Sequence, residues 1–169
     1  MLIFEKGMVK LESEEKSIIA ENMLKYENYK EQNGRLKKAL DNHFYLEAIF
    51  IEYTIIEDRL SSILRYEGNS IKSKNHVSID KKLSKLDEIA REKKGLANRY
   101  FTPEFIDSIR KWKEKRNPLV HSLMKQNLTS EFLYEIAFEG HNLQKELCRL
   151  SQNYKRAVER KQKYENPNK

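Results

Sequence analysis

One short segment of the chain gathers the residue types that acid–base chemistry on a phosphate requires. It reads Arg116-Asn117-Pro118-Leu119-Val120-His121. A histidine can move protons near neutral pH, and an arginine can hold a phosphate through a fixed fork of N–H donors. The chain also carries a formal net charge of +7. Together these features favour chemistry on a polyanion.

The chemistry that fits this segment best is cleavage of RNA by its own 2′-hydroxyl. That reaction needs a base for the hydroxyl proton, an acid for the leaving oxygen and positive charge on the phosphate. His121 can serve as base or acid, and Arg116 suits the non-bridging oxygens. Asn117 lies four residues before His121, so the two share a face if the segment is helical. Asn117 could hold the histidine or a phosphate, or it could only cap a helix.

A basic run precedes the segment. Its lysines, Lys111, Lys113 and Lys115, alternate with Trp112 and Glu114. Such a run is usually a solvated helix face, but its position directly before Arg116 predicts contacts with an RNA backbone. Trp112 is expected in the core. The pI near 9.3 is by itself weaker support for a nucleic-acid partner, because a basic surface is often only solvated.

The elements that must position these residues are expected to be helices. Only 5 Gly and 3 Pro occur in 169 residues, and no stretch alternates as a strand would. The fold class is therefore an all-α, single helical-bundle domain of five or six helices. Its main element is a helix from Leu36 or Asp41 to Tyr66, in which Leu46, Ile49, Phe50, Tyr53, Ile56 and Leu60 follow helical spacing.

The remaining boundaries follow from capping and breaking residues. A first helix over 12–32 should end at Asn33-Gly34. Ser78 and Thr102-Pro103 are expected to start two further helices, and Pro118 should break the second of these. A last helix should run from Thr129 or Ser130 to Tyr164. This organisation divides the chain into an N-terminal extension (1–35), a bundle (36–160) and a basic, disordered tail (161–169).

The composition also bears on the cellular compartment in which the protein is expected. Cys148 is the only cysteine, so neither an intrachain disulfide nor a Cys-rich zinc site is possible. We expect no metal and no cofactor. The first residues lack the apolar core of a signal peptide, and no stretch approaches the roughly 18 apolar residues that span a bilayer. A cytoplasmic protein without a membrane partner is therefore expected.

The pattern Arg-Asn-x-x-x-His at Arg116, Asn117 and His121 resembles the motif of HEPN domains, which are small all-helical domains of prokaryotic toxins and defence systems. The segment Ile51–Leu60 is similar to the long helix that precedes the motif in many members, and the resemblance covers roughly 36–150. It implies a homodimer in which two motifs face each other. It also implies a metal-independent endoribonuclease that leaves 2′,3′-cyclic phosphate ends.

Other functions stay open beside this one. The same surface could belong to a non-catalytic HEPN scaffold that binds a nucleotide or a partner protein such as an antitoxin. A DNA-binding protein is a weaker alternative, because no recognition-helix signature is present. Glu57 lies between Tyr53 and Leu60 on the apolar face of its predicted helix. It could be a supporting acid that points at the motif, or only a residue at the boundary of that face.

Overall fold

The computed structural model of the chain describes residues 2–67, 77–92, 95–122 and 128–165, with side chains except at 2–16, 18 and 120–122. This part is all-helical and forms one bundle, which confirms the predicted fold class. Among the described residues, no helix combines the length and apolar character needed to cross a bilayer. The helices are α1 (Leu2–Asp41), α2 (Tyr45–Tyr66), α3 (Ile79–Arg91), α4 (Pro103–Ser122) and α5 (Ser130–Glu165), with a 3₁₀ turn, η1, at Ala97–Arg99.

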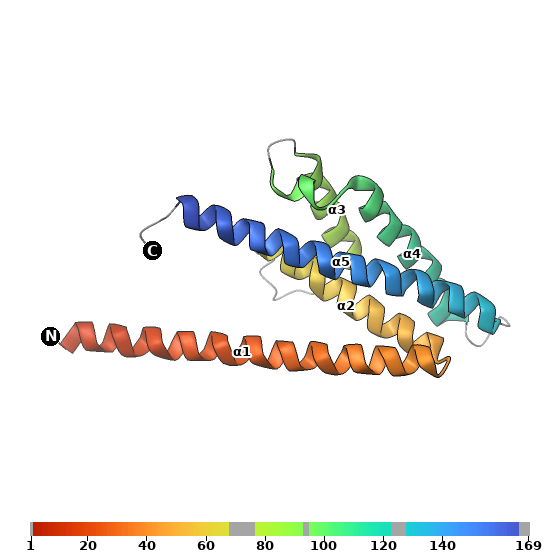
Figure 1. Cartoon of the computed structure of the whole chain (residues 1–169), viewed down its shortest axis with the longest axis horizontal. Coiled ribbons are helices and arrows are strands. Elements are labelled where there is room, and N and C mark those ends of the chain that lie inside the picture. Colours follow the sequence, from red (N-terminus) through yellow and green to blue (C-terminus); the bar gives the residue numbers. More distant parts are fainter. Residues whose placement is uncertain (1, 68–76, 93–94, 123–127, 166–169) are drawn as a thin grey trace.

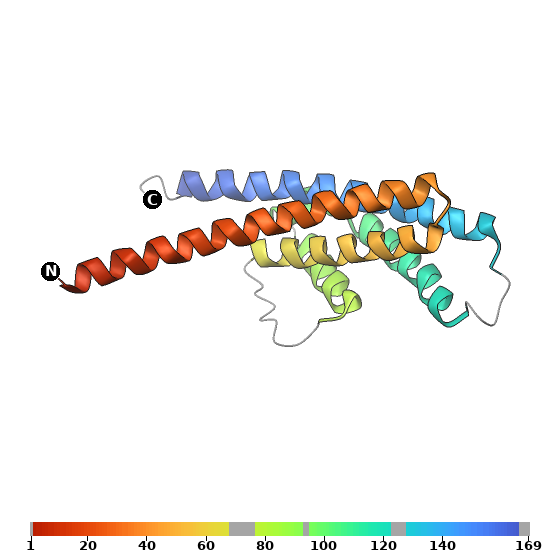
Figure 2. The ribbon, with the colours of Figure 1, turned by 90° about the horizontal axis from the view of Figure 1, so that it is seen from below.

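The bundle is built around α2 and α5, which run side by side in the same direction (Figures 1 and 2). The first helix, α1, packs against α2 in the opposite direction. On the other side, α3 contacts α2, and α4 contacts α3 and α5. The α2–α5 pair therefore has two faces. We call them the α1 face and the α4 face.

The first helix is much longer than its partner. Its 40 residues span about 60 Å, whereas the 22 residues of α2 span about 33 Å. Its N-terminal part consequently projects beyond the other helices (Figure 2). An anchor holds α1 to α2: Tyr29 and Lys25 both donate hydrogen bonds to the Asp58 carboxylate, at 2.5 Å and 3.0 Å. Burial opposes ionisation of Asp58, but these hydrogen bonds still lower its pKa.

Trp112 is buried in the core, as predicted. Its side chain has no exposed surface, and its indole Nε1 donates a 2.9 Å hydrogen bond to the Ile136 carbonyl oxygen. That bond ties α4 to α5 and satisfies the one polar atom that the indole brings into the interior. The predicted helix starts are also confirmed. Ser78, Thr102 and Thr129 each accept a hydrogen bond from a backbone N–H three residues on.

The predicted break at Gly34 is wrong. Nothing lies within 4 Å of where a Cβ on Gly34 would stand, and α1 continues through it to Asp41. The chain reverses instead at His43, whose φ of 61° is left-handed, and the Phe44 N–H donates to the Ala39 carbonyl oxygen at 2.8 Å. The second helix thus begins at Tyr45, later than expected, and a division of the chain at 35/36 would fall inside α1.

The last helix begins where the sequence placed it and runs one residue past Tyr164. The basic tail predicted for 161–169 is therefore helical as far as Glu165, with Lys161 and Glu165 forming a 3.7 Å ion pair one turn apart. Residues 166–169 lie outside the described part of the chain.

Candidate functional site

The fourth helix carries the motif without interruption. It continues through Pro118 to Ser122, so the prediction that Pro118 breaks the helix and that Asn117 caps a new one is wrong. Proline removes one N–H from the helical ladder and leaves the carbonyl of Glu114 without its usual partner. Glu114, Asn117 and Pro118 are all exposed, so water can satisfy that carbonyl.

An unbroken helix fixes how the motif positions are distributed around its axis. Successive helical residues are about 100° apart, which places Asn117 and His121 within about 40° of each other. Arg116 and His121 are then about 140° apart and do not share a face. The backbone of His121 belongs to α4, but its side chain lies outside the described residues.

Arg116 rests against aromatic side chains of α2. Its guanidinium carbon lies 4.3 Å from the ring centroid of Tyr53 and 4.9 Å from that of Phe50. Its Nε is buried without a hydrogen-bond partner, and no carboxylate among the described side chains pairs with it. Two rings therefore orient the guanidinium, and its charge is not neutralised by an acid. This is a suitable state for a group that receives an anion.

Charged groups surround Tyr53. Burial raises the pKa of this tyrosine, the Glu57 carboxylate raises it further, and the Arg116 and Lys113 cations oppose the rise. Glu57 thus lies in the neighbourhood of the motif. Glu57 also forms an ion pair with Lys82, whose Nζ is 2.9 Å from Glu57 Oε1. Glu57 is half-buried at the edge of the α2–α3 contact, a position that fits a boundary residue.

The three lysines predicted to bind RNA are all held in ion pairs. Lys111 pairs with Asp107 at 2.9 Å and Lys115 with Glu139 at 2.7 Å. Lys113 is 8% exposed and pairs with Asp80 of α3. Lys111 and Lys115 are four residues apart and share one side of α4, whereas Lys113 lies on the side that faces α3. The three lysines therefore do not present one row of free cations beside Arg116.

The sequence reading missed a buried acid beside this region. Glu52 has no exposed surface, and neither of its carboxylate oxygens has a hydrogen-bond partner among the described residues. Burial raises its pKa to about 9, so the side chain is protonated and neutral at pH 7. It lies against Gly140 and Trp112. Glu52 lies three residues after Ile49 and four before Ile56, so helical spacing places it on the apolar face of its helix. That spacing is the sequence signal for its burial.

Several aromatic side chains of α2 and α5 are exposed. Phe50 is 45% exposed and Phe138 is 52% exposed. Tyr134 stacks on Phe138 with 5.8 Å between ring centroids, and it meets Tyr45 edge-on at 5.5 Å. The contact between Tyr45 and Tyr134 could not be predicted from the sequence, because it joins segments almost ninety residues apart.

Within the described residues, no group of three or more His, Cys, Asp or Glu side chains has the arrangement of a metal site. Comparison of the chain with protein-family models, with curated proteins and with solved structures gave no match. The resemblance to HEPN domains accordingly depends on the motif at Arg116, Asn117 and His121 and on the order of the helices.

Proposed function

We propose that the protein is a metal-independent endoribonuclease of the toxin or defence type, acting in the cytoplasm. The observation that carries the proposal is the state of Arg116. Its guanidinium is held against Phe50 and Tyr53, and it forms no ion pair with any described carboxylate. In the proposed reaction this cation stabilises the charge that develops on the phosphate, and the His121 imidazole moves the proton.

A second copy of the chain supplies the missing half of the proposed site. Arg116 and His121 of one chain project about 140° apart around α4, so a single copy does not direct both at one phosphate. In a twofold dimer with the α4 helices facing, His121 of one copy can approach Arg116 of the other. Base and acid then come from different chains. The exposed ring of Phe50, which lies against Arg116, would form an apolar part of that interface.

Asn117 shares a helical face with His121 and is exposed. Since it caps no helix, its side-chain amide is available to hold the imidazole or a phosphate oxygen. We assign it a positioning role in the proposed site. Lys111, Lys113 and Lys115 would contribute only long-range positive charge while their ion pairs persist.

The decisive experiment is cleavage of a 5′-labelled RNA in EDTA by the wild-type protein and by its His121→Ala, Arg116→Ala and Lys115→Ala variants. The first two should be slower by at least about 10²-fold, the usual effect of removing a general acid or base or a charge stabiliser. Arg116→Lys should restore little, because an ammonium lacks the two-pronged fork. Lys115→Ala is the neighbouring control and should stay close to wild type.

Product ends test the chemistry directly. Attack by the 2′-hydroxyl leaves a 2′,3′-cyclic phosphate, and an RNA with a single 2′-deoxy nucleotide at the cleavage position should resist cleavage. Activity that EDTA abolishes and a divalent ion restores would refute the proposal. So would a His121→Ala protein as active as wild type.

A non-catalytic scaffold is the second candidate, and the ion pairs favour it. With Lys111, Lys113 and Lys115 all paired, the α4 face presents few free cations to RNA, while the exposed ring of Phe50 suits a protein partner such as an antitoxin. Light scattering of the purified protein separates the candidates when combined with the cleavage assay. A stable dimer that cleaves no RNA supports the scaffold.

A further inference from the structure

A long groove lies on the α1 face, away from the motif. Two adjoining cavities of about 900 Å³ and 680 Å³ lie along α1, against α2 and α5, and share the lining residues Tyr26, Tyr29, Arg59 and Gln152. On α1 their lining extends from Glu21 to Asp41. Twenty helical residues correspond to about 30 Å, so the groove is far longer than a single small ligand needs.

The lining of this groove is strongly basic. Only two acids, Asp41 and Glu21, line it, against eight cations: Lys25, Lys30, Lys37, Arg59, Arg65, Lys145, Arg149 and Lys155. Lys25, Arg149 and Lys155 have carboxylate partners. The other five have no ion pair with any described side chain. The three lysines of α4 differ from these five cations, because each of them is paired with a carboxylate. Most of the positive charge in the groove is thus not neutralised by ion pairs.

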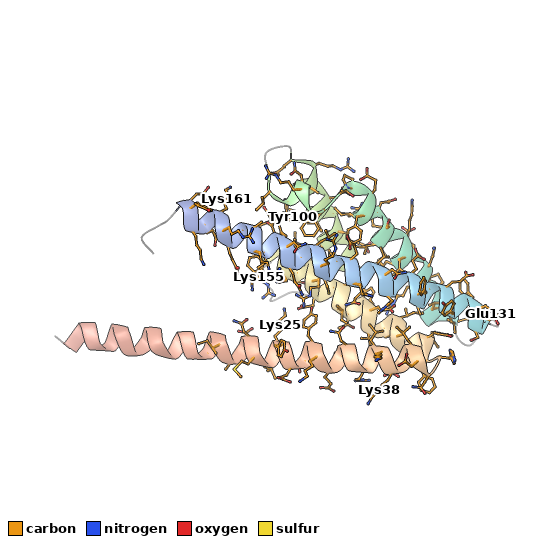
Figure 3. The ribbon with its side chains drawn as sticks, in the orientation of Figure 1. Lys25, Lys38, Tyr100, Glu131, Lys155 and Lys161 are labelled. Atoms are coloured by element: carbon orange, nitrogen blue, oxygen red, sulfur yellow. The ribbon has the colours of Figure 1, made fainter. Side chains whose placement is uncertain are left out.

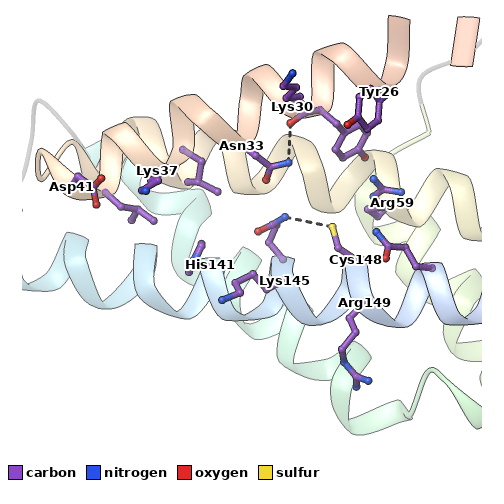
Figure 4. Close-up of a pocket in the computed structure, with 15 residues that line it drawn as sticks. Tyr26, Lys30, Asn33, Lys37, Asp41, Arg59, His141, Lys145, Cys148 and Arg149 are labelled. Atoms are coloured by element: carbon purple, nitrogen blue, oxygen red, sulfur yellow. Dashed lines mark hydrogen bonds between the residues drawn. The ribbon is translucent and has the colours of Figure 1, made fainter. Parts of the chain in front are cut away.

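The cations come from three helices and meet across the groove. Figure 4 shows Lys37 on α1, Lys145 on α5 and Arg59 on α2 around the same cavity. Farther along, Lys25 of α1 and Lys155 of α5 lie on facing sides (Figure 3). The environment of His141 agrees with this distribution: burial lowers the pKa of its imidazole, and the Lys145 cation lowers it further.

Aromatic and amide groups complete the lining. Tyr26 is 66% exposed and lines both cavities. The guanidinium of Arg59 is stacked 4.1 Å from the ring centroid of Tyr29, which presents a flat cation at the floor. Asn33 and Gln152 add uncharged donors. A basic groove with flat aromatic and guanidinium surfaces is the combination that binds single-stranded nucleic acids, since phosphates follow the charge and bases stack on the rings.

We infer that the groove between α1 and α5 is a binding site for single-stranded nucleic acid, separate from the α4 motif. The inference does not depend on the proposed cleavage. Arg59, Lys37 and Lys145 would contact successive phosphates, and Tyr26 would offer a stacking surface.

The test uses the full chain and a fluorescein-labelled dT20, which lacks the 2′-hydroxyl and therefore cannot be cut by the proposed reaction. Fluorescence anisotropy should report binding that weakens with salt, with a log–log slope of about −2 to −3.5 for three to five phosphate contacts. A labelled mononucleotide should bind at least about tenfold more weakly than dT20, because it reaches only one part of the groove.

A matched pair of double variants locates the site. Lys37→Glu with Lys145→Glu should weaken dT20 binding at least about tenfold, because two phosphate contacts become repulsive. Lys81→Glu with Arg99→Glu makes the same change in net charge on α3 and η1, where both side chains are exposed and without a described ion pair. That control should stay within about threefold of wild type at 0.15 M salt, where distant charges are screened. Circular dichroism should show equal helicity in both.

The single cysteine provides a second, local readout. Cys148 lines the groove and is half-buried. Saturating dT20 should slow the reaction of its thiol with a maleimide in the wild type but not in the Lys37→Glu/Lys145→Glu protein. Equal loss of binding in the two double variants, an unprotected Cys148, mononucleotide binding as tight as that of dT20, or no binding at 0.05 M salt would each overturn the inference.

Discussion

The two faces of the α2–α5 pair use positive charge in different ways. On the α4 face, Lys111, Lys113 and Lys115 are each paired with a carboxylate. Arg116 is the exception, and two aromatic rings hold it. On the α1 face, the cations of the groove are mostly unpaired. A basic sequence run therefore does not by itself mark a basic surface, because the fold decides which charges are neutralised.

The faces also differ in packing. Behind α4, Trp112, Gly140 and Glu52 are pressed together with no space for an added atom. Between α1 and α5 the helices diverge and leave the groove (Figure 1). The close packing holds α4 against α5, whereas the open groove leaves side chains free to receive a ligand. The predictions that follow test this difference.

The largest effect should come from the buried acid. The pKa of Glu52 is raised from 4.5 to about 9, so between these values the folded chain keeps a proton that the unfolded chain has lost. The free energy of unfolding should therefore fall as pH rises from 7 to 9, by up to about 1.4 kcal/mol per pH unit. Glu52→Gln should remove this dependence, as measured by urea unfolding at several pH values.

This pH window lies above the usual titration range of histidine, so His141 contributes little to the slope. Glu57→Gln is the control, because Glu57 is paired with Lys82, and it should keep the wild-type slope. A wild-type protein whose stability is constant between pH 7 and 9 would show that Glu52 is solvated or paired.

Gly140→Ala should give the next largest effect. Its Cβ would overlap the Glu52 carboxylate and lie 2.6 Å from Trp112 Cζ2, closer than real Cβ atoms approach. Overpacking of this kind typically costs about 1–3 kcal/mol. Chemical denaturation should show the loss, and the fluorescence of the only tryptophan should change with it. An unchanged midpoint and spectrum would mean that α4 can move away from α5 freely.

Gly34→Ala should act in the opposite direction. The position is inside α1, it is exposed, and nothing lies within 4 Å of an added Cβ. Alanine is favoured over glycine in a helix interior by about 1 kcal/mol, so the variant should be more stable by up to that amount. Thermal unfolding measures the gain. A destabilised variant would indicate a bend or contact at Gly34 that the straight helix does not contain.

The smallest expected effect is the difference in the free energy of unfolding between removing a paired lysine and removing an unpaired one. Lys115→Ala removes the pair with Glu139, an exposed contact expected to contribute less than about 1 kcal/mol. Lys37→Ala removes an unpaired cation of the groove and should leave the free energy of unfolding unchanged or slightly higher. Urea unfolding at low salt compares them. A larger loss for Lys37 than for Lys115 would contradict the distinction between the two faces.

The sequence by itself determined the helices and most of their ends. Periodic apolar residues, few glycines and prolines, and hydroxyl caps at Ser78, Thr102 and Thr129 are local signals, and local hydrogen bonding obeys them. The same signals misplaced two boundaries. Gly34 and Pro118 disfavour helix locally, yet both stand in exposed positions where the surrounding helix tolerates them. The helix reversal at His43 has only a weak local signature.

Only the tertiary structure decided the surroundings of each charge. Arg116 meets Phe50 and Tyr53 across more than sixty residues of sequence, and Lys113 meets Asp80 across thirty-three. Sequence periodicity states which face of a helix is apolar, but not which helix lies against it. The groove between α1 and α5 exists because two long helices diverge, and burial of Glu52 follows from the packing of three helices around one position. Those are properties of the assembled bundle, and no single segment contains them.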